Sequence, residues 1–170
     1  MKRLTVLRHA KSRWDDLVIG DFNRPLNERG WLAAKRIGRE LRKRDFHFDF
    51  VLASPAARVR ETIDGVENKF SFNAPIKFEQ RMYLAAEELL LSLVRDFPES
   101  VRHPLLVGHN PGLQSLLLDL SKNDDEGLRD RVADKFPTAA LAVLDLPAQR
   151  WTEVEPKSGW IKELVLDKDL

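Results

Sequence analysis

Four side chains suited to phosphoryl chemistry occur where short apolar runs of the sequence end. They are Arg8 and His9 after the run 4–7, Arg58 shortly after the run 48–53, and His109 just after the run 104–107. The planar guanidinium group of arginine forms paired hydrogen bonds to phosphate oxygens and stays charged. A neutral imidazole can attack phosphorus, and a charged one can donate a proton. The pattern predicts that these four residues surround one phosphate, with the two arginines as its clamp.

Each of the three runs is typical of a buried strand, because it is short, apolar and bounded by charged or turn-forming residues. Ligands of open α/β sheets bind at the carboxyl ends of the strands, which is where the four residues would lie. Helices are expected to start at Pro55 and at Asn110-Pro111, where a capping residue precedes proline, and another is expected over 84–97. Arg58 lies about one turn into the first helix, so its side chain can reach back to the strand end. The amino terminus of the helix after Pro111 adds partial positive charge at the same place.

The alternation of strands and helices predicts a single α/β domain over residues 1–170. We expect a three-layer sandwich, in which helices cover both faces of a mostly parallel central sheet. The carboxyl-terminal part adds antiparallel edge strands, which we expect over 138–146, over 151–154 and over 160–166. The stretch 13–23 has no apolar period and is expected to be a loop next to the first strand.

Composition limits the classes of function. The 170 residues include 28 Lys and Arg against 27 Asp and Glu, so the formal net charge of +1 gives no general attraction to nucleic acid or to a membrane surface. The absence of cysteine excludes disulfides, zinc–thiolate sites and a cysteine nucleophile. The first apolar run is too short for a signal peptide, and no stretch has the length of a membrane span, so we expect a cytoplasmic protein.

Four stretches match a known family in order and spacing. Arg8–Trp14 resembles the signature of the histidine phosphatase superfamily, which includes the cofactor-dependent phosphoglycerate mutases. Asp21–Gly30 resembles the small bacterial branch named for SixA, a phosphohistidine phosphatase. Ser54–Arg58 and Val107–Pro111 supply the other two matches, and the likeness continues to Phe136–Ala140. The resemblance therefore covers nearly the whole chain.

This resemblance implies that His9 is phosphorylated during turnover and that water then releases inorganic phosphate. It assigns phosphate contacts to Arg8 and Arg58 and assigns stabilisation of the phosphoryl oxygens to His109. It implies no metal and no cofactor. The family usually has glycine after the histidine of the first motif, and here Ala10 still lets the backbone approach closely.

The general acid is open. Mutase-like members place a glutamate shortly before a tyrosine, and Glu79 lies one residue out of that register before Tyr83. The alternatives are that Glu79 is a surface carboxylate beside Arg81, or that the branch uses no acid at this position. A good leaving group such as imidazole needs less help from a positioned acid.

The resemblance favours a phosphatase that hydrolyses a phosphate monoester or a phosphoramidate, with protein phosphohistidine as substrate. One alternative is a broad phosphatase of small metabolites. Another is a binding module that holds a phosphorylated partner without turnover. His47 and His103 do not follow the pattern and are expected to be structural or exposed, and Arg60 should face away from Arg58.

Overall fold

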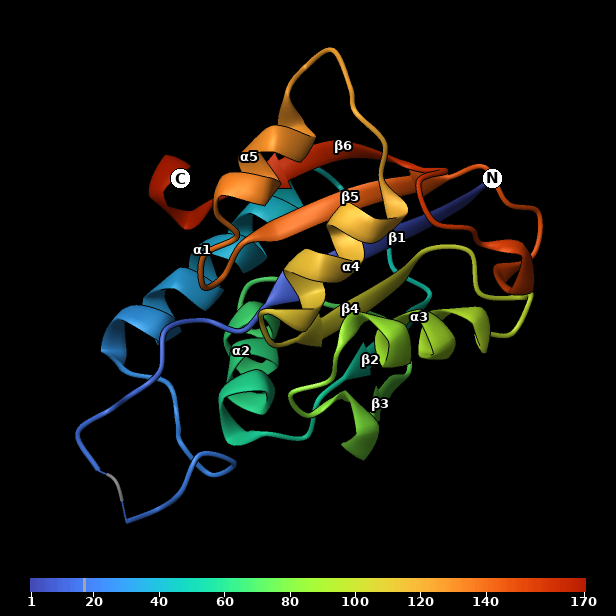
Figure 1. Ribbon diagram of the computed structural model, residues 1–170. Helices are drawn as coiled ribbons and strands as arrows, with labels where there is room; N and C mark the ends of the chain where they lie inside the picture. The colour runs from blue at the N-terminus through green and yellow to red at the C-terminus, as the bar shows by residue number, and fades with distance from the viewer. Residues whose placement is uncertain (17) are drawn as a thin grey trace.

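One mixed sheet organises the protein. A computed structural model describes residues 1–16 and 18–170, and within them six strands lie in the order β3-β2-β4-β1-β5-β6 (Figure 1). The strands are β1 Lys2–Arg8, β2 Phe50–Ala53, β3 Ile76–Phe78, β4 Pro104–Gly108, β5 Leu141–Leu146 and β6 Trp160–Val165. Strands β1 to β4 run parallel to one another, whereas β5 runs antiparallel to β1 and β6 runs antiparallel to β5.

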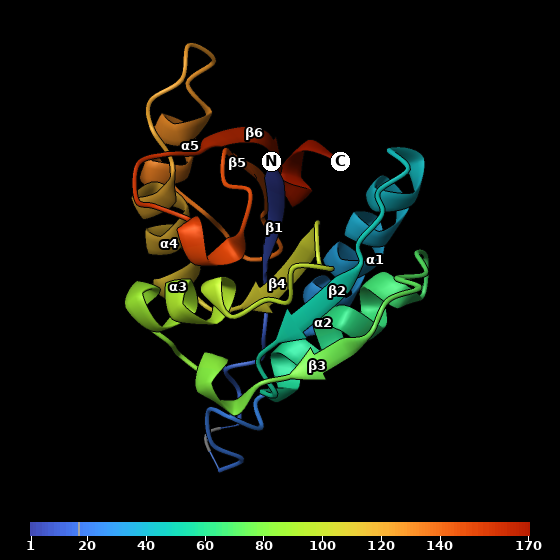
Figure 2. The same cartoon turned by 90° about the vertical axis from the view of Figure 1, so that its right-hand side faces the viewer.

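Helices cover both faces of this sheet, which confirms the predicted α/β sandwich. They are α1 Glu28–Lys43, α2 Ala57–Glu67, α3 Glu87–Arg95, α4 Gly112–Leu120 and α5 Leu128–Asp134. Figure 2 shows α1 and α2 on one side of the sheet and α3, α4 and α5 on the other. Within the described residues, none of these helices has the length and apolarity that a membrane crossing requires.

The sequence of β1 explains why it is apolar without alternation. Successive side chains of a strand point to opposite faces. Val6 therefore packs into the core under α3 and α4, while Leu7 packs into the core under α1 and α2. In β4, Leu106 and Val107 divide between the two cores in the same way. Both strands are buried on both faces, as their continuous apolar runs predict.

The two helix starts nearest the site come later than predicted. Helix α2 begins at Ala57 because Ser54 and Pro55 form the turn before it, where the Ser54 hydroxyl accepts the backbone N–H of Ala56. Helix α4 begins at Gly112, after a cis Asn110–Pro111 bond.

The helix expected over 84–97 is also shorter, and spans Glu87–Arg95 as α3. Leu84 has a φ angle of 52°, in the left-handed region, which interrupts helical backbone there.

The predicted strand over 151–154 is wrong, and its residues form a 3₁₀ turn, Trp151–Glu153. The Trp151 indole is fully buried and donates its Nε1–H to the Val101 carbonyl at 2.7 Å. This anchor packs the segment beside α3, so that the chain returns to pair with β5 only at Trp160. The loop over 13–23 has no helix or strand in its described residues, and residue 17 lies outside them.

The strands that lead to the predicted site residues are neighbours in the sheet. Arg8 of β1 aligns with Gly108 of β4, and Ala53 of β2 aligns with Val107 of β4. Because these three strands are parallel and adjacent, their carboxyl ends form one edge of the sheet, and the residues that follow them face the same space.

Candidate active site

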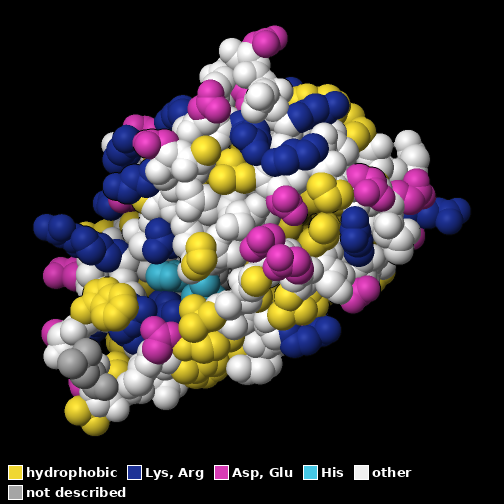
Figure 3. Space-filling model, viewed as in Figure 1, with side chains coloured by type: hydrophobic (Ala, Val, Ile, Leu, Met, Phe, Trp, Pro, Cys, Tyr) yellow, Lys and Arg dark blue, Asp and Glu magenta, His cyan; other side chains and the backbone are white. Residues whose placement is uncertain are grey.

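The sheet edge holds a cleft of about 350 Å³ that is lined by all four predicted residues, Arg8, His9, Arg58 and His109. The imidazole centroids of His9 and His109 lie 5.4 Å apart. In the space-filling view, the histidine side chains lie in a hollow that basic and hydrophobic side chains surround (Figure 3). The structure thus brings together residues that lie as far apart in the sequence as Arg8 and His109.

His9 is held in the form that can act as a nucleophile. Its Nδ1 lies 2.7 Å from the carbonyl oxygen of Ala10, and because a carbonyl only accepts, Nδ1 must carry the proton. The lone pair is then on Nε2. Burial, with the nearby charge of Arg58, lowers the pKa of His9 to about 3, although the bond to Ala10 opposes this shift. His9 is therefore neutral near pH 7.

A threonine joins the end of β1 to the helix that carries Arg58. The buried Thr62 hydroxyl accepts the backbone N–H of Ala10 at 2.9 Å and donates to the carbonyl of Arg58 at 2.6 Å. It fixes the backbone beside His9 against the first turn of α2, so that the imidazole and the guanidinium keep their relative position.

Replacing Thr62 with valine is expected to destabilise the protein by about 1–3 kcal/mol, because the buried N–H of Ala10 loses its acceptor while the side-chain volume is preserved. The measurement is urea unfolding, with the midpoint compared at an unchanged slope. Thr62→Ser keeps the hydroxyl and should lose less stability than Thr62→Val. Equal losses in the two variants would contradict the role given to the hydroxyl.

The guanidinium groups of Arg8 and Arg58 make one side of the cleft positively charged. Arg58 is 2% exposed. Burial, followed by the charge of Arg58, lowers the pKa of Arg8. Arg8 donates to the carbonyl of Phe136 at 3.1 Å. The Nε atoms of both arginines are buried and make no hydrogen bond within the part of the chain that the structure describes. Two like charges with spare donors favour an anion between them.

His109 directly follows β4 and lines the cleft together with Arg8 and Arg58. Its Nε2 is 2.7 Å from the Ser54 hydroxyl, and the Tyr83 ring packs edge-on against it at 5.5 Å. Burial, followed by the charge of Arg58, lowers the pKa of His109 to about 4. The ring is neutral near pH 7, and a phosphoryl dianion beside it would favour the charged, donating form.

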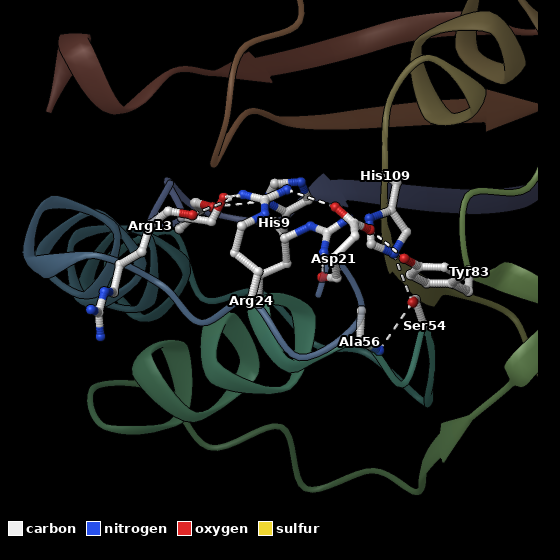
Figure 4. A network of polar contacts seen from close by, with 11 residues as sticks. His9, Arg13, Asp21, Arg24, Ser54, Ala56, Tyr83 and His109 are labelled. Carbon is white, nitrogen blue, oxygen red and sulfur yellow. Dashed lines mark hydrogen bonds and ion pairs between the residues drawn. The ribbon is translucent and has the colours of Figure 1, made fainter. Parts of the chain in front are cut away.

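Sequence reasoning missed two residues of the loop before α1. The Asp21 carboxylate accepts from Arg58 and from Arg24, each at 3.1 Å, and from the Tyr83 hydroxyl (Figure 4). Arg24 also donates to the Ser12 hydroxyl and stacks on the Trp14 ring at 3.6 Å. Both residues lie in the segment that resembles the SixA branch, which was the only signal for them in the sequence.

Glu79 does not line the cleft. Its carboxylate accepts from the Arg81 side chain at 2.7 Å and from the Arg81 backbone N–H at 3.3 Å, at the start of a 3₁₀ turn, Gln80–Met82. The hydrogen bonds from Arg81 lower the pKa of Glu79, which favours the ionised form. The pairing with Arg81 is the one named above in the alternative to a general acid, but the Glu79 side chain is only 13% exposed.

The other residues set apart from the site also lie outside the cleft. The His103 ring nitrogen lies 2.7 Å from the Thr5 hydroxyl, just before β4 and so at the opposite sheet edge, and the exposed His47 contacts the Asp45 carbonyl. Arg60 donates to the Pro55 carbonyl and stacks on the Phe78 ring, so its guanidinium lies away from the cleft.

The chain resembles known proteins over most of its length. Residues 4–83 match the family model described as histidine phosphatase superfamily (branch 1). An uncharacterised protein of Mycobacterium tuberculosis strain H37Rv is 35% identical over 152 residues, which are 88% of this chain and 92% of that protein.

Solved structures give the same result. The candidate phosphohistidine phosphatase SixA of Agrobacterium tumefaciens is 32% identical, with a TM-score of 0.81 and 97% of each chain covered. The protein histidine phosphatase SixA complexed with tungstate has the same fold at 18% identity, with a TM-score of 0.80 and 98% of each chain covered.

Proposed function

The chain belongs to the histidine phosphatase superfamily, and from this membership we propose that it is a phosphatase that passes a phosphoryl group to His9 and then to water. The observation that carries the proposal is a neutral imidazole, with Nε2 unprotonated, beside the buried Arg58 guanidinium and the half-buried Arg8 guanidinium. A binding module would need only the cations, whereas this arrangement also supplies a nucleophile.

In the proposed reaction, Nε2 of His9 attacks the phosphorus in line with the leaving group. Arg8 and Arg58 bind the phosphoryl oxygens, whose charge is the main quantity that a catalyst of phosphoryl transfer must stabilise. The Ala10 carbonyl holds the Nδ1 proton as the phosphorylated ring becomes cationic. His109 donates to a further oxygen once the dianion has favoured its protonation. Water then attacks the phosphohistidine, and inorganic phosphate leaves.

We propose a phosphohistidine side chain of a protein as the substrate. The names of the SixA relatives support this choice. The apolar side chains at the opening of the cleft also support this choice. Trp14 and Leu84 line the cleft, and their exposed fractions are 71% and 55%. Apolar surface at an open mouth suits a ring carried on a macromolecule more than a small polar metabolite.

The substrate is tested by comparing kcat/KM on a phosphohistidine peptide with kcat/KM on sugar and nucleotide monophosphates. The expected result is preference for the peptide by on the order of 100-fold, since only this substrate combines a ring with a good leaving group. The rate with His9→Ala is subtracted as background, because phosphohistidine also hydrolyses without enzyme. Preference for the small esters would identify a metabolite phosphatase, and tight phosphate binding without turnover would identify a binding module.

A further inference from the structure

Asp21 is an acidic residue in a cleft otherwise built for an anion. Among the described residues that line the cleft, it carries the one carboxylate. The Arg58 guanidinium donates to the Asp21 backbone carbonyl at 2.8 Å and to its carboxylate at 3.1 Å. The Asp21 carboxylate therefore accepts from guanidinium donors that a phosphoryl group would use (Figure 4).

The proposed reaction also needs a proton donor for the leaving group. When the bond from phosphorus to the leaving group breaks, the electron pair goes to the leaving nitrogen or oxygen, which then needs a proton. Glu79 is held by Arg81 outside the cleft. Asp21 is at the site, and its side chain is 43% exposed, so it can exchange protons with solvent.

We propose that Asp21 is the general acid of the first step and the general base of the second. This inference rests on the proposed function, since it assumes phosphoryl transfer to His9. A phosphoryl dianion displaces the carboxylate from Arg58 and Arg24, and Asp21 then lies beside negative oxygens without its cationic partners. Both changes favour proton uptake by the carboxylate, because nearby like charge and loss of opposite charge each stabilise the neutral acid.

Two proton transfers then complete the cycle. Nε2 of His9 bonds to phosphorus and the bond from phosphorus to the leaving group breaks. The leaving atom keeps the electron pair of that bond and takes a proton from Asp21. Water next attacks the phosphohistidine and gives its proton to Asp21. The P–Nε2 bond breaks, its electron pair returns to His9, and phosphate departs with one water oxygen. Loss of the proton then lets the carboxylate rebind Arg58 and Arg24.

The resting pKa is consistent with this exchange of partners. Partial burial raises the pKa of Asp21, but hydrogen bonds from Tyr83 and Arg24 and the charge of Arg58 outweigh that effect and lower it to about 2. The ionised form thus depends on groups that substrate would engage. Tyr83 packs edge-on against Phe22 at 5.1 Å and donates to the carboxylate, so it acts as a positioning residue for Asp21.

The test is the dependence of kcat/KM on the leaving group, measured with aryl and alkyl phosphates of increasing leaving-group pKa. Asp21→Asn should reduce kcat/KM by about 10²–10³-fold for alkyl phosphates and hardly at all for 2,4-dinitrophenyl phosphate, whose leaving group needs no proton. Tyr83→Phe should show the same trend with a smaller slope. Asp15→Asn removes an equal charge from the same loop, where Asp15 pairs with Arg13, and should leave the series unchanged.

Two outcomes would overturn the inference. If Asp21→Asn changes all substrates by one factor, or only tightens inorganic phosphate binding, the carboxylate is a competitor for the arginines and not an acid. If Glu79→Gln shows the leaving-group dependence instead, the acid is Glu79. Retained hydrolysis of dinitrophenyl phosphate shows that the variant is folded. Loss of this activity on His9→Ala tests the proposed function separately.

Discussion

His9→Asn will abolish phosphate release and the covalent label together. Without the nucleophile, the two-step route through phosphohistidine is closed, and we expect kcat to fall by at least about 10³-fold. Asparagine is small enough for the site and its amide can still donate to the Ala10 carbonyl, so the loss should reflect chemistry and not folding.

The measurement is incubation with a labelled phosphodonor, followed by acid and base treatment and peptide mapping. The wild-type label should be acid-labile, base-stable and located on the peptide that contains His9. His47→Gln is the control, because it removes an exposed histidine whose ring contacts the Asp45 carbonyl. A label that maps to His109, or that persists in His9→Asn, would contradict the assignment of the nucleophile.

Arg58→Met will lower kcat/KM by about 10²–10³-fold, which corresponds to losing two charge-assisted hydrogen bonds to the phosphoryl group. Methionine fills part of the buried space that the Arg58 side chain occupies, but it carries no charge. Arg58→Lys should recover little, because an ammonium group lacks the planar fork that pairs with two oxygens. Inorganic phosphate should also bind more weakly to both variants, which competitive inhibition measures.

The matched control is Arg60→Met, two positions further along the same helix. Arg60 is exposed, donates to the Pro55 carbonyl and stacks on Phe78, away from the cleft. Its loss should leave kcat/KM within a factor of about two, as expected for a surface side chain. Similar losses in Arg58→Met and Arg60→Met would mean that Arg58 acts through the stability of α2 and not through phosphate.

The sheet could be predicted from sequence because its central strands are buried on both faces and read as uninterrupted apolar runs. The convergence of His9 and His109 follows from that sheet, since adjacent parallel strands end at one edge. The predicted first residues of the helices were less accurate than the predicted strands. Leu84 has a left-handed φ angle, and nothing in the sequence pattern indicates it, so the predicted helix start at 84 was too early.

Asp21 and Arg24 could not be placed from sequence, because their loop has no period. Their positions depend on contacts with residues far along the chain, such as Arg58 and Tyr83, and these contacts exist only after the sheet has formed. The position of Glu79 likewise depends on a contact that the sequence pattern does not show. Glu79 precedes Tyr83 one residue out of the register of the mutase-like members, and its carboxylate pairs with Arg81 and does not line the cleft.

The pairing of β1 with β4 also limits when this protein can become active during its synthesis. Arg8 aligns with Gly108, so Arg8 and His109 meet only after the hundred residues between them have left the ribosome. Closing so large a loop is slow compared with local helix formation. A nascent or truncated chain that stops before residue 104 would contain both arginines and His9, yet it would lack the strand that aligns them, and it should be inert toward cellular phosphates.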